Sequence, residues 1–440
     1  MSYSMIATTM FALMMLLMMT GQRVFAAIGA VAALAALALW GTGGADIPFT
    51  AAMKLMKWYP LLTLPMFIFM GYVLSESKIA DDLYQMFHVW MGPVHGGLAI
   101  GTIGLMVLVS AMNGLSVAGM AIGATIALPE LLRRGYDKQM VTGVIQAGSS
   151  LGILVPPSVV LVLYAMIARQ PVGQLWLAGV VPGLMMAVLF ILYIAIRCKL
   201  NPELGPVLPE EERQVSMAEK MRLLRAGLLP LGIFAVMMVP FVNGWTSLVE
   251  SSALGAMAAV VAAIAKKRMN KTVFENSLRN TLAISCMFMW IILAALGFGA
   301  VFDGLGAVKA IENLFTEQLG LSPWMILILM QLSFLVMGTF LDDTAMLVIV
   351  APLYVPLVQA LGFDLIWYGV LYTVTTQIAY MTPPFGYNLF LMRAMAPPEI
   401  RLRDIYGSIL PFVAVMVAAL ILLMVFPQIA LWLPHYVYNN

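Results

Sequence analysis

Runs of apolar residues long enough to cross a lipid bilayer follow one another along most of the 440-residue chain. A bilayer core needs about 20 apolar residues per helix. Clear runs lie near residues 3–20, 24–41, 60–75, 176–196, 227–242, 251–265, 281–301, 323–340 and 407–426. Two more apolar stretches, 97–168 and 338–396, are interrupted by glycine, proline, serine and threonine. The sequence therefore predicts an all-α polytopic membrane protein in a lipid bilayer, with about 11–13 membrane segments.

Composition supports the membrane class and argues against several others. Hydrophobic residues make up 62% of the chain and charged residues 10%, whereas soluble domains carry about 25% charged residues. The net charge of +2 is too small to indicate nucleic-acid binding. Two cysteines, Cys198 and Cys286, cannot build a metal cluster or a disulfide framework. His88, His95 and His435 are too scattered for a metalloenzyme, and we expect no organic cofactor.

Charge placement suggests how the chain is oriented. The apolar run 5–19 lacks a basic start and a small-residue cleavage site, so we expect a retained helix and no signal peptide. Residues 197–225 are rich in charge and are predicted to form a solvated loop that divides the protein into halves. Residues 266–271 form a basic cluster. Short basic loops favour the cytoplasm, and the two helices between these segments allow both to lie there.

The two interrupted stretches resemble each other at an offset of 227 residues. The matched residues are Pro129 with Pro356, Gly135 with Gly362, Asp137 with Asp364, and Pro156-Pro157 with Pro383-Pro384. Duplicated, proline-broken membrane segments are typical of secondary transporters, whose sites lie between the repeats. The sequence does not distinguish parallel from inverted repeats. We expect inverted repeats, because they provide two faces that can open in turn.

The proline pairs predict chemistry in the middle of the membrane. Proline removes a backbone donor and frees a carbonyl, and an unsatisfied backbone group in hydrocarbon costs several kcal/mol. Such backbone survives where protein buries it or where it lines a hydrated cavity. We therefore expect re-entrant hairpins with tips at 148–158 and 375–388, whose carbonyl oxygens suit small hard cations. A kinked helix in a bundle is the alternative interpretation.

Each proline pair follows another break at a matching distance, at residues 110–119 and 337–345. The second break contains Asp342 and Asp343 within an otherwise apolar run. A central aspartate costs roughly 2.5–3.5 kcal/mol on insertion scales. A purely structural role is therefore not expected for both aspartates.

Several motifs resemble the large membrane subunit (M) of TRAP (tripartite ATP-independent periplasmic) transporters. They are YPLLTLPMFIFMG (59–71), SAMNGLSVAG, IALPELLRRGYD, GSSLGILVPPS, GWTSLVESSALGA, FLDDTA and YMTPPFGYNLF. The resemblance extends from about residue 5 to about residue 430. It implies an elevator-type importer of the ion-transporter superfamily, with two helical hairpins and about two bound sodium ions. It also implies a multi-pass location in the bacterial inner membrane.

The resemblance further implies partner proteins and a division of the chain. The partners are a small four-helix membrane subunit (Q type), expected as a separate chain, and a periplasmic substrate-binding protein (P type). The expected parts are 1–96, N-terminal scaffold and arm helices; 97–170, first transport core with hairpin 1; 171–265, linking helices and cytoplasmic loop; 266–322, second scaffold helices; 323–400, second transport core with hairpin 2; and 401–440, a C-terminal membrane helix.

Site residues follow from the resemblance position by position. Sodium site 1 would use Asn113, Leu115, Gly152, Val155 and Pro157. Sodium site 2 would use Gly338, Asp342, Ala379, Thr382 and Pro384. Two positions depart from the usual family pattern: Leu115 offers only its carbonyl, and Asp343 stands where many members have proline. Asp343 could be an extra ligand, a proton carrier or a salt-bridged structural residue.

The expected substrate is an organic anion, contacted by Ser158, Asn388 and Arg393. Arg393 could pair with a carboxylate in bidentate fashion, or it could extend to the membrane interface. The sequence looks most like the branch for α-keto acids, other monocarboxylates or chloroaromatic acids. A stand-alone sodium/carboxylate symporter of the same superfamily is the main alternative. We expect no enzymatic activity, because the Asp342/Asp343 pair is the only candidate dyad.

Overall fold

Apolar runs become helices throughout the part of the chain described by the computed structural model, residues 3–438 except 21, 115, 214, 305, 307–319, 340–342 and 384–385. No strand occurs among these residues. The first half contains α1 (Tyr3–Met19), α2 (Val24–Trp40), α3 (Asp46–Met56), α4 (Thr63–Glu76), α5 (Ile79–Met91), α6 (Gly97–Asn113), α7 (Ser116–Ile122), α8 (Leu128–Arg133), α9 (Lys138–Ser150), α10 (Val159–Ala168) and α11 (Val172–Leu200). The second half contains α12 (Glu210–Arg213), α13 (Met217–Val242), α14 (Leu248–Ala265), α15 (Lys271–Gly304), α17 (Pro323–Gly338), α18 (Asp343–Ala360), α19 (Leu365–Tyr380), α20 (Tyr387–Met395), α21 (Leu402–Val425) and α22 (Gln428–Tyr438).

Six helical segments among the described residues are long and apolar enough to cross a membrane. They are Phe25–Ala51, Val172–Leu200, Met217–Val242, Leu248–Ala265, Lys271–Phe302 and Leu402–Val425. Five shorter apolar helices accompany them, among them part of α6 and the whole of α10 and α17. The chain is thus an all-helical polytopic membrane protein, as predicted. The predicted number of 11–13 segments includes helices too short to cross a bilayer alone.

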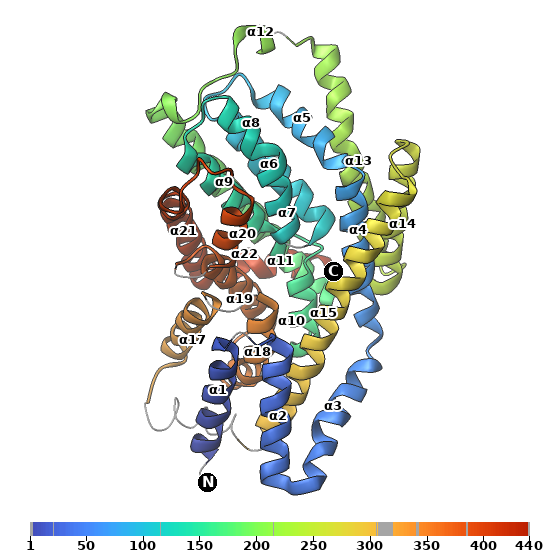
Figure 1. Ribbon diagram of the computed structural model, residues 1–440, viewed down its shortest axis with the longest axis vertical. Helices are drawn as coiled ribbons and strands as arrows, with labels where there is room; N and C mark the ends of the chain where they lie inside the picture. The colour runs from blue at the N-terminus through green and yellow to red at the C-terminus, as the bar shows by residue number, and fades with distance from the viewer. Residues whose placement is uncertain are drawn as a thin grey trace.

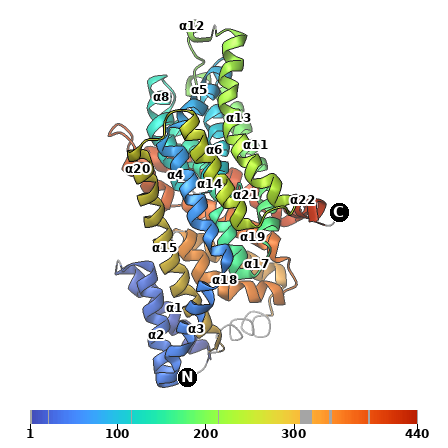
Figure 2. The ribbon, with the colours of Figure 1, turned by 90° about the vertical axis from the view of Figure 1, so that its right-hand side faces the viewer.

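One long helix organises one side of the molecule. α15 packs along α2, α3 and α4, and α14 packs against α4 and α13. Figures 1 and 2 show α15 extending along much of the long axis, beside α2 and α3 at one end. On the other side, α11 packs against α6, α10, α19, α21 and α22. The interrupted helices α6–α10 and α17–α20 lie mainly to the left of α14 and α15 in Figure 1.

The predicted bounds of the solvated loop, 197–225, are wrong at both ends. α11 continues to Leu200 and α13 begins at Met217, so the segment between these helices is 201–216. Arg197 and Lys199 lie in the last turn of α11. Long basic side chains can keep their stems on apolar surface while their charges reach water, so these charges do not end the helix. The C-terminal part contains α21, which is long and apolar enough to cross a membrane, followed by α22.

An ion-pair network fastens this connecting segment to the helices beneath it. Arg134, at the end of α8, contacts Glu130 at 2.8 Å and Glu212 of α12 at 2.6 Å. Its hydrogen bond holds the pKa of Glu212 below the usual value of 4.5. Burial and the nearby Arg134 lower the pKa of His88, so that ring is neutral at pH 7. Because the pKa of Glu212 is lowered, its attachment persists at neutral pH and weakens as pH falls below the usual value.

Replacing Arg134 should loosen this segment locally. In Arg134→Gln, amide hydrogen exchange of residues 210–213 should rise by up to about fivefold, since a partly exposed ion pair contributes about 0–1 kcal/mol. Arg133→Gln is the matched control, because Arg133 is highly exposed and pairs with Glu130. Equal exchange in the two variants would rule out the proposed attachment.

Candidate functional site

The first proline pair separates two helices at the centre of the molecule. α9 ends at Ser150, a short turn covers Leu151–Ile153, and α10 begins at Val159. Proline disfavours the α conformation in the residue before it and lacks a backbone donor, so Pro156-Pro157 keeps this stretch non-helical. All residues from 151 to 158 are buried. The break therefore places non-helical backbone inside protein, where such backbone is tolerated at membrane depth.

The direction of the chain at this break differs from the prediction. α10 lies beyond the end of α9 in Figure 1, and the two helices do not fold back along each other. The reversal occurs instead at Gly114, between α6 and α7. A methyl group on Gly123 would lie 2.6 Å from Met106 Cε, so the chain on either side of Gly114 runs antiparallel. A proline pair interrupts a helix, whereas a tight reversal uses the left-handed backbone that Gly114 adopts at φ +65°.

The turn at Gly114 rests directly on the proline break. A methyl group on Gly114 would lie 2.0 Å from the carbonyl oxygen of Pro157. The amide of Val159 donates a hydrogen bond to the carbonyl of Gly114 at 3.3 Å. Two irregular backbone segments, 45 residues apart at Gly114 and Val159, thus touch. Their close approach brings several backbone oxygens and amides into a small buried volume.

A corresponding arrangement appears in the second interrupted stretch. Ser333 of α17 and Tyr354 of α18 share a hydrogen bond of 2.9 Å, so these helices pack antiparallel around the break between them. Gly338, at the end of α17, faces the end of α19: a methyl group there would lie 2.5 Å from Ala379 Cβ. α19 ends at Tyr380 and α20 begins at Tyr387. The end of α17 therefore meets the broken helix α19–α20, as the turn at Gly114 meets the broken helix α9–α10.

The two broken helices run in opposite directions beside each other. Lys138, at the start of α9, donates to the carbonyl of Glu399 beyond the end of α20 at 3.1 Å. The hydroxyl of Tyr164 in α10 donates to the carbonyl of Leu365 at the start of α19 at 2.8 Å. Between these ends, Gln377 Nε2 donates to the carbonyl of Ser150 at 2.7 Å. The breaks therefore meet at the same level of the molecule.

A layer of uncharged polar side chains fills the space between the breaks. Gln146, Gln377 and Asn388 are all fully buried. Asn388 Nδ2 donates to the carbonyl of Gln146 and to Ser149 Oγ, both at 3.4 Å. The side-chain oxygens of Gln146, Gln377 and Asn388 accept no hydrogen bond from the residues that the structure describes. Buried polar atoms are normally satisfied by protein, water or an ion, so these oxygens are free to accept a hydrogen bond from water or to contact a cation.

Sequence reasoning missed Gln146 as a site residue and gave Gln377 no individual role. A signal was present, because Gln377 lies 227 residues after Ser150, its hydrogen-bond partner, which is the offset of the repeat. Amides beside proline pairs in apolar helices are the pattern that would have identified them.

The described members of predicted sodium site 1 lie together. Gly152, Val155 and Pro157 are buried in the first break, and the carbonyl of Pro157 faces Gly114. Asn113 is the last residue of α6, next to this contact, and its side chain is not among the described ones. Leu115 lies outside the described residues. The structure thus places the described positions of this predicted site close together.

Predicted sodium site 2 is described in part. Gly338 and Ala379 are in contact and buried. The hydroxyl of Thr382 donates to the carbonyl of Ile378 at 2.7 Å, and the carbonyl of Thr382 accepts from the amide of Gly386 at 3.2 Å. Asp342 and Pro384 lie outside the described residues. Asp343 is the first residue of α18, and its side chain is likewise outside them.

The three predicted substrate residues have different surroundings. Asn388 lies in the buried polar layer. Ser158 caps α10: its hydroxyl accepts from the amide of Leu161 at 3.1 Å and donates to the carbonyl of Ile153, so it is used within the chain. Arg393 is exposed near the end of α20 and donates to the carbonyl of Ile400 at 3.0 Å. Only Asn388 joins the amides between the breaks.

Comparison with known proteins relates this architecture to a transport family. Residues 11–429 match the family model described as the tripartite ATP-independent periplasmic transporter, DctM component. The C4-dicarboxylate TRAP transporter large permease protein DctM of Pseudomonas aeruginosa is 31% identical over 381 residues, covering 86% of this chain and 87% of that protein. The ectoine TRAP transporter large permease protein TeaC of Halomonas elongata is 28% identical, covering 85% and 86%.

A solved structure extends the fold relationship. MtrF of Neisseria gonorrhoeae, described with a class of antimetabolite efflux pumps, superposes with a TM-score of 0.62 at 15% identity, covering 89% of this chain and 85% of that one. This likeness concerns the fold alone. The family match over nearly the whole length decides the assignment: the chain belongs to the DctM family, the large permease component of TRAP transporters, and is a transport protein rather than an enzyme.

Proposed function

We propose that this permease imports an organic carboxylate together with sodium ions across the bacterial inner membrane, by an elevator movement, after delivery by a periplasmic binding protein. Large permeases of this family work with such a binding protein and a small membrane subunit. The relatives are described with different substrates, C4-dicarboxylates for DctM and ectoine for TeaC. A carboxylate of the α-keto acid or other monocarboxylate class is the substrate that the sequence motifs favour.

The observation that carries the proposal is the contact between the Gly114 turn and the Pro156-Pro157 break. Carbonyl and amide oxygens are neutral, and they suit a small hard cation without burying an opposing charge. The side-chain oxygens of Gln146, Gln377 and Asn388 extend this uncharged oxygen-rich region toward the second break. Such surroundings favour a sodium ion at each break, with Asp342 contributing charge to the second.

The opposed directions of the two broken helices support an inverted repeat. α9 and α10 descend in Figure 1, whereas α19 and α20 rise. Inverted repeats of this kind place binding sites at their interface near the bilayer midplane. In the proposed elevator, α6–α10 and α17–α20 move together against the support formed by α2–α4 and α13–α15.

The energetics favour import of an anion. Two sodium ions with one monovalent carboxylate carry one net positive charge inward, which gains about 2.3 kcal/mol per 100 mV of membrane potential. The sodium gradient adds to this gain. An uncoupled carboxylate would instead move against the potential.

Reconstitution tests the proposal directly. With the small subunit and the binding protein present, an inward sodium gradient should drive uptake of the cognate acid, identified by screening the binding protein for thermal stabilisation. Replacing sodium with choline should abolish accumulation, because no coupling ion remains. Undiminished uptake in choline would refute the sodium coupling, and full uptake without the binding protein would indicate a stand-alone symporter.

A further inference from the structure

A cavity of about 790 Å³ opens between the helical support and the interrupted helices. One wall consists of α3 and α15, and the other of the end of α10 and part of α18. The cavity lies in the half of the molecule opposite α12 and the basic segment 266–271 (Figure 1). It is separate from the buried amide layer between the two breaks, and its residues play no part in the sites described above.

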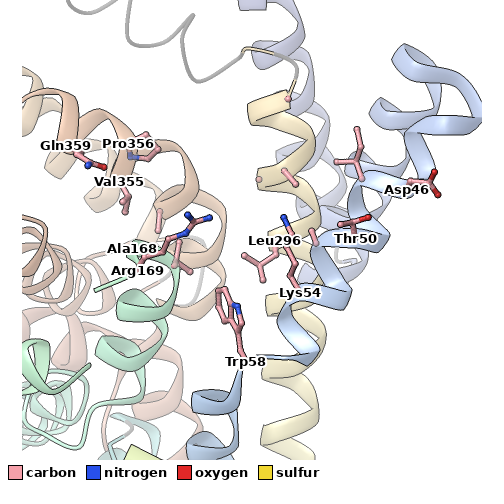
Figure 3. Close-up of a pocket in the computed structure, with 17 residues that line it drawn as sticks. Asp46, Thr50, Lys54, Trp58, Ala168, Arg169, Leu296, Val355, Pro356 and Gln359 are labelled. Atoms are coloured by element: carbon pink, nitrogen blue, oxygen red, sulfur yellow. The ribbon is translucent and has the colours of Figure 1, made fainter. Parts of the chain in front are cut away.

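Two cationic side chains enter this cavity from opposite walls. Figure 3 shows Lys54 of α3 and Arg169, which follows α10, on either side of the opening, with Trp58 near them. The carboxylate that lines the cavity, Asp46, lies on the far side of Lys54 from Arg169 (Figure 3). Among the described residues, no ion pair is formed by Lys54 or Arg169. Positive charge therefore dominates the space between the walls.

Arg169 caps α10 in the left-handed conformation, with φ 54°. Lys78 and Lys267 adopt the same conformation at φ 55° and do not line the cavity, so the backbone alone assigns no role to Arg169. The case for Arg169 rests on its place in the wall of the cavity, opposite Lys54 (Figure 3).

The remaining lining favours an anion with an apolar body. Trp58, Leu296 and Val355 supply aromatic and aliphatic surface beside the two cations, and Thr50 and Gln359 add uncharged polar groups. Cations of this type pair with carboxylates, while apolar walls remove the rest of a small ligand from water. The volume is within the range of small-molecule sites, about 300–1,000 Å³.

We propose that this cavity is a second, outward-side binding site for a small organic carboxylate, with Arg169 and Lys54 as its cationic partners. That the bound anion is the transported substrate, on its way to the central site, rests on the proposed import function. Lys54 belongs to the support and Arg169 to the interrupted helices, so a bound carboxylate bridges the two parts. An anionic lipid shares the same chemistry, a negative group on an apolar body, and the test separates the two sources.

Charged thiol reagents measure the preference of the cavity for anions. Thr50→Cys in a Cys198→Ala, Cys286→Ala background places a thiol on the cavity wall. Its labelling rate with a sulfonate-bearing methanethiosulfonate is compared with its rate with a trimethylammonium-bearing one. Each rate is divided by the rate of the same reagent with free 2-mercaptoethanol. The purified chain is used in a neutral detergent, and neither sodium nor uptake is required.

The sulfonate reagent should react faster, because the two lining cations, Lys54 and Arg169, outnumber the one lining carboxylate, Asp46, and a positive local potential concentrates anions. Arg169→Gln and Lys54→Gln should each lower the sulfonate-to-ammonium ratio by about threefold or more. Lys57→Gln, three residues from Lys54 and outside the cavity lining, should leave the ratio unchanged. Adding benzoate, the probe for a soluble carboxylate, should slow sulfonate labelling, and Arg169→Gln should remove this protection.

Equal normalised rates for the two reagents, or a ratio insensitive to both substitutions, would overturn the proposal. So would protection by phosphatidylglycerol in nanodiscs without protection by benzoate, since that result assigns the cavity to lipid. Anion-selective labelling in a chain that fails to transport would leave this site intact and contradict the import function alone.

Discussion

Gly114→Ala is expected to reduce sodium-dependent uptake by more than about tenfold. The added methyl group would lie 2.0 Å from the Pro157 carbonyl oxygen, and backbone atoms cannot move aside as a flexible side chain can. Such overpacking costs typically 1–3 kcal/mol, in addition to the strain of a side chain at φ +65°. The turn must therefore retreat from the break, which separates the oxygens proposed to hold sodium. Initial uptake rates in proteoliposomes measure the effect.

Gly135→Ala is the matched control for this substitution. Gly135 also has positive φ, +76°, but a methyl group there meets nothing within 4 Å. It carries the same type of backbone strain without the collision. If Gly135→Ala reduced uptake as strongly as Gly114→Ala, the close contact between turn and break would not be the cause.

Gln377→Leu should weaken the connection between the two broken helices at the level of their breaks. Its amide donates to the carbonyl of Ser150 at 2.7 Å in a fully buried setting, so leucine leaves that carbonyl without this donor. A buried group left unsatisfied costs about 1–3 kcal/mol. We expect a lower melting temperature and a several-fold loss of uptake, because the breaks no longer stay at one level. Both are measured on the purified and reconstituted protein.

Gln139→Leu is the control, because it tests whether replacing another glutamine of the broken helices also lowers the melting temperature and uptake. Gln139 lies on α9 and is exposed. Its replacement should change melting temperature and uptake little, as surface substitutions usually do. Unaltered uptake in Gln377→Leu would show that the buried hydrogen bond between α19 and α9 is dispensable.

The places where the helices stop could be predicted from the sequence, but the path of the chain there could not. Proline pairs identify the breaks at 151–158 and after Tyr380, because proline chemistry is local. The reversal at Gly114 depends on how Met106 packs against Gly119 and Gly123, which is tertiary information. The hairpins were therefore predicted, but the turn was assigned to the wrong break.

The buried amides show a second limit of sequence reasoning. In an almost wholly apolar helix, periodicity does not reveal which face meets another helix. The role of Gln377 is apparent only where the ends of α9 and α19 meet, because its amide donates to the carbonyl of Ser150. Gln146 likewise acquires a role through Asn388 of α20, which donates to its carbonyl. The charged residues at the ends of α11 and α13 were wrongly assigned to a loop. Basic residues at a membrane boundary can belong to a helix.

Equilibrium binding of radioactive sodium to the purified permease tests the central claim most directly, because it needs neither substrate nor partner proteins. Wild type and Gly135→Ala should bind sodium saturably, with displacement by unlabelled sodium but not by choline, and Gly114→Ala should lose a distinct part of that binding. Absence of saturable binding, or equal binding in all three proteins, would contradict the account of the turn and the proline break as a cation site.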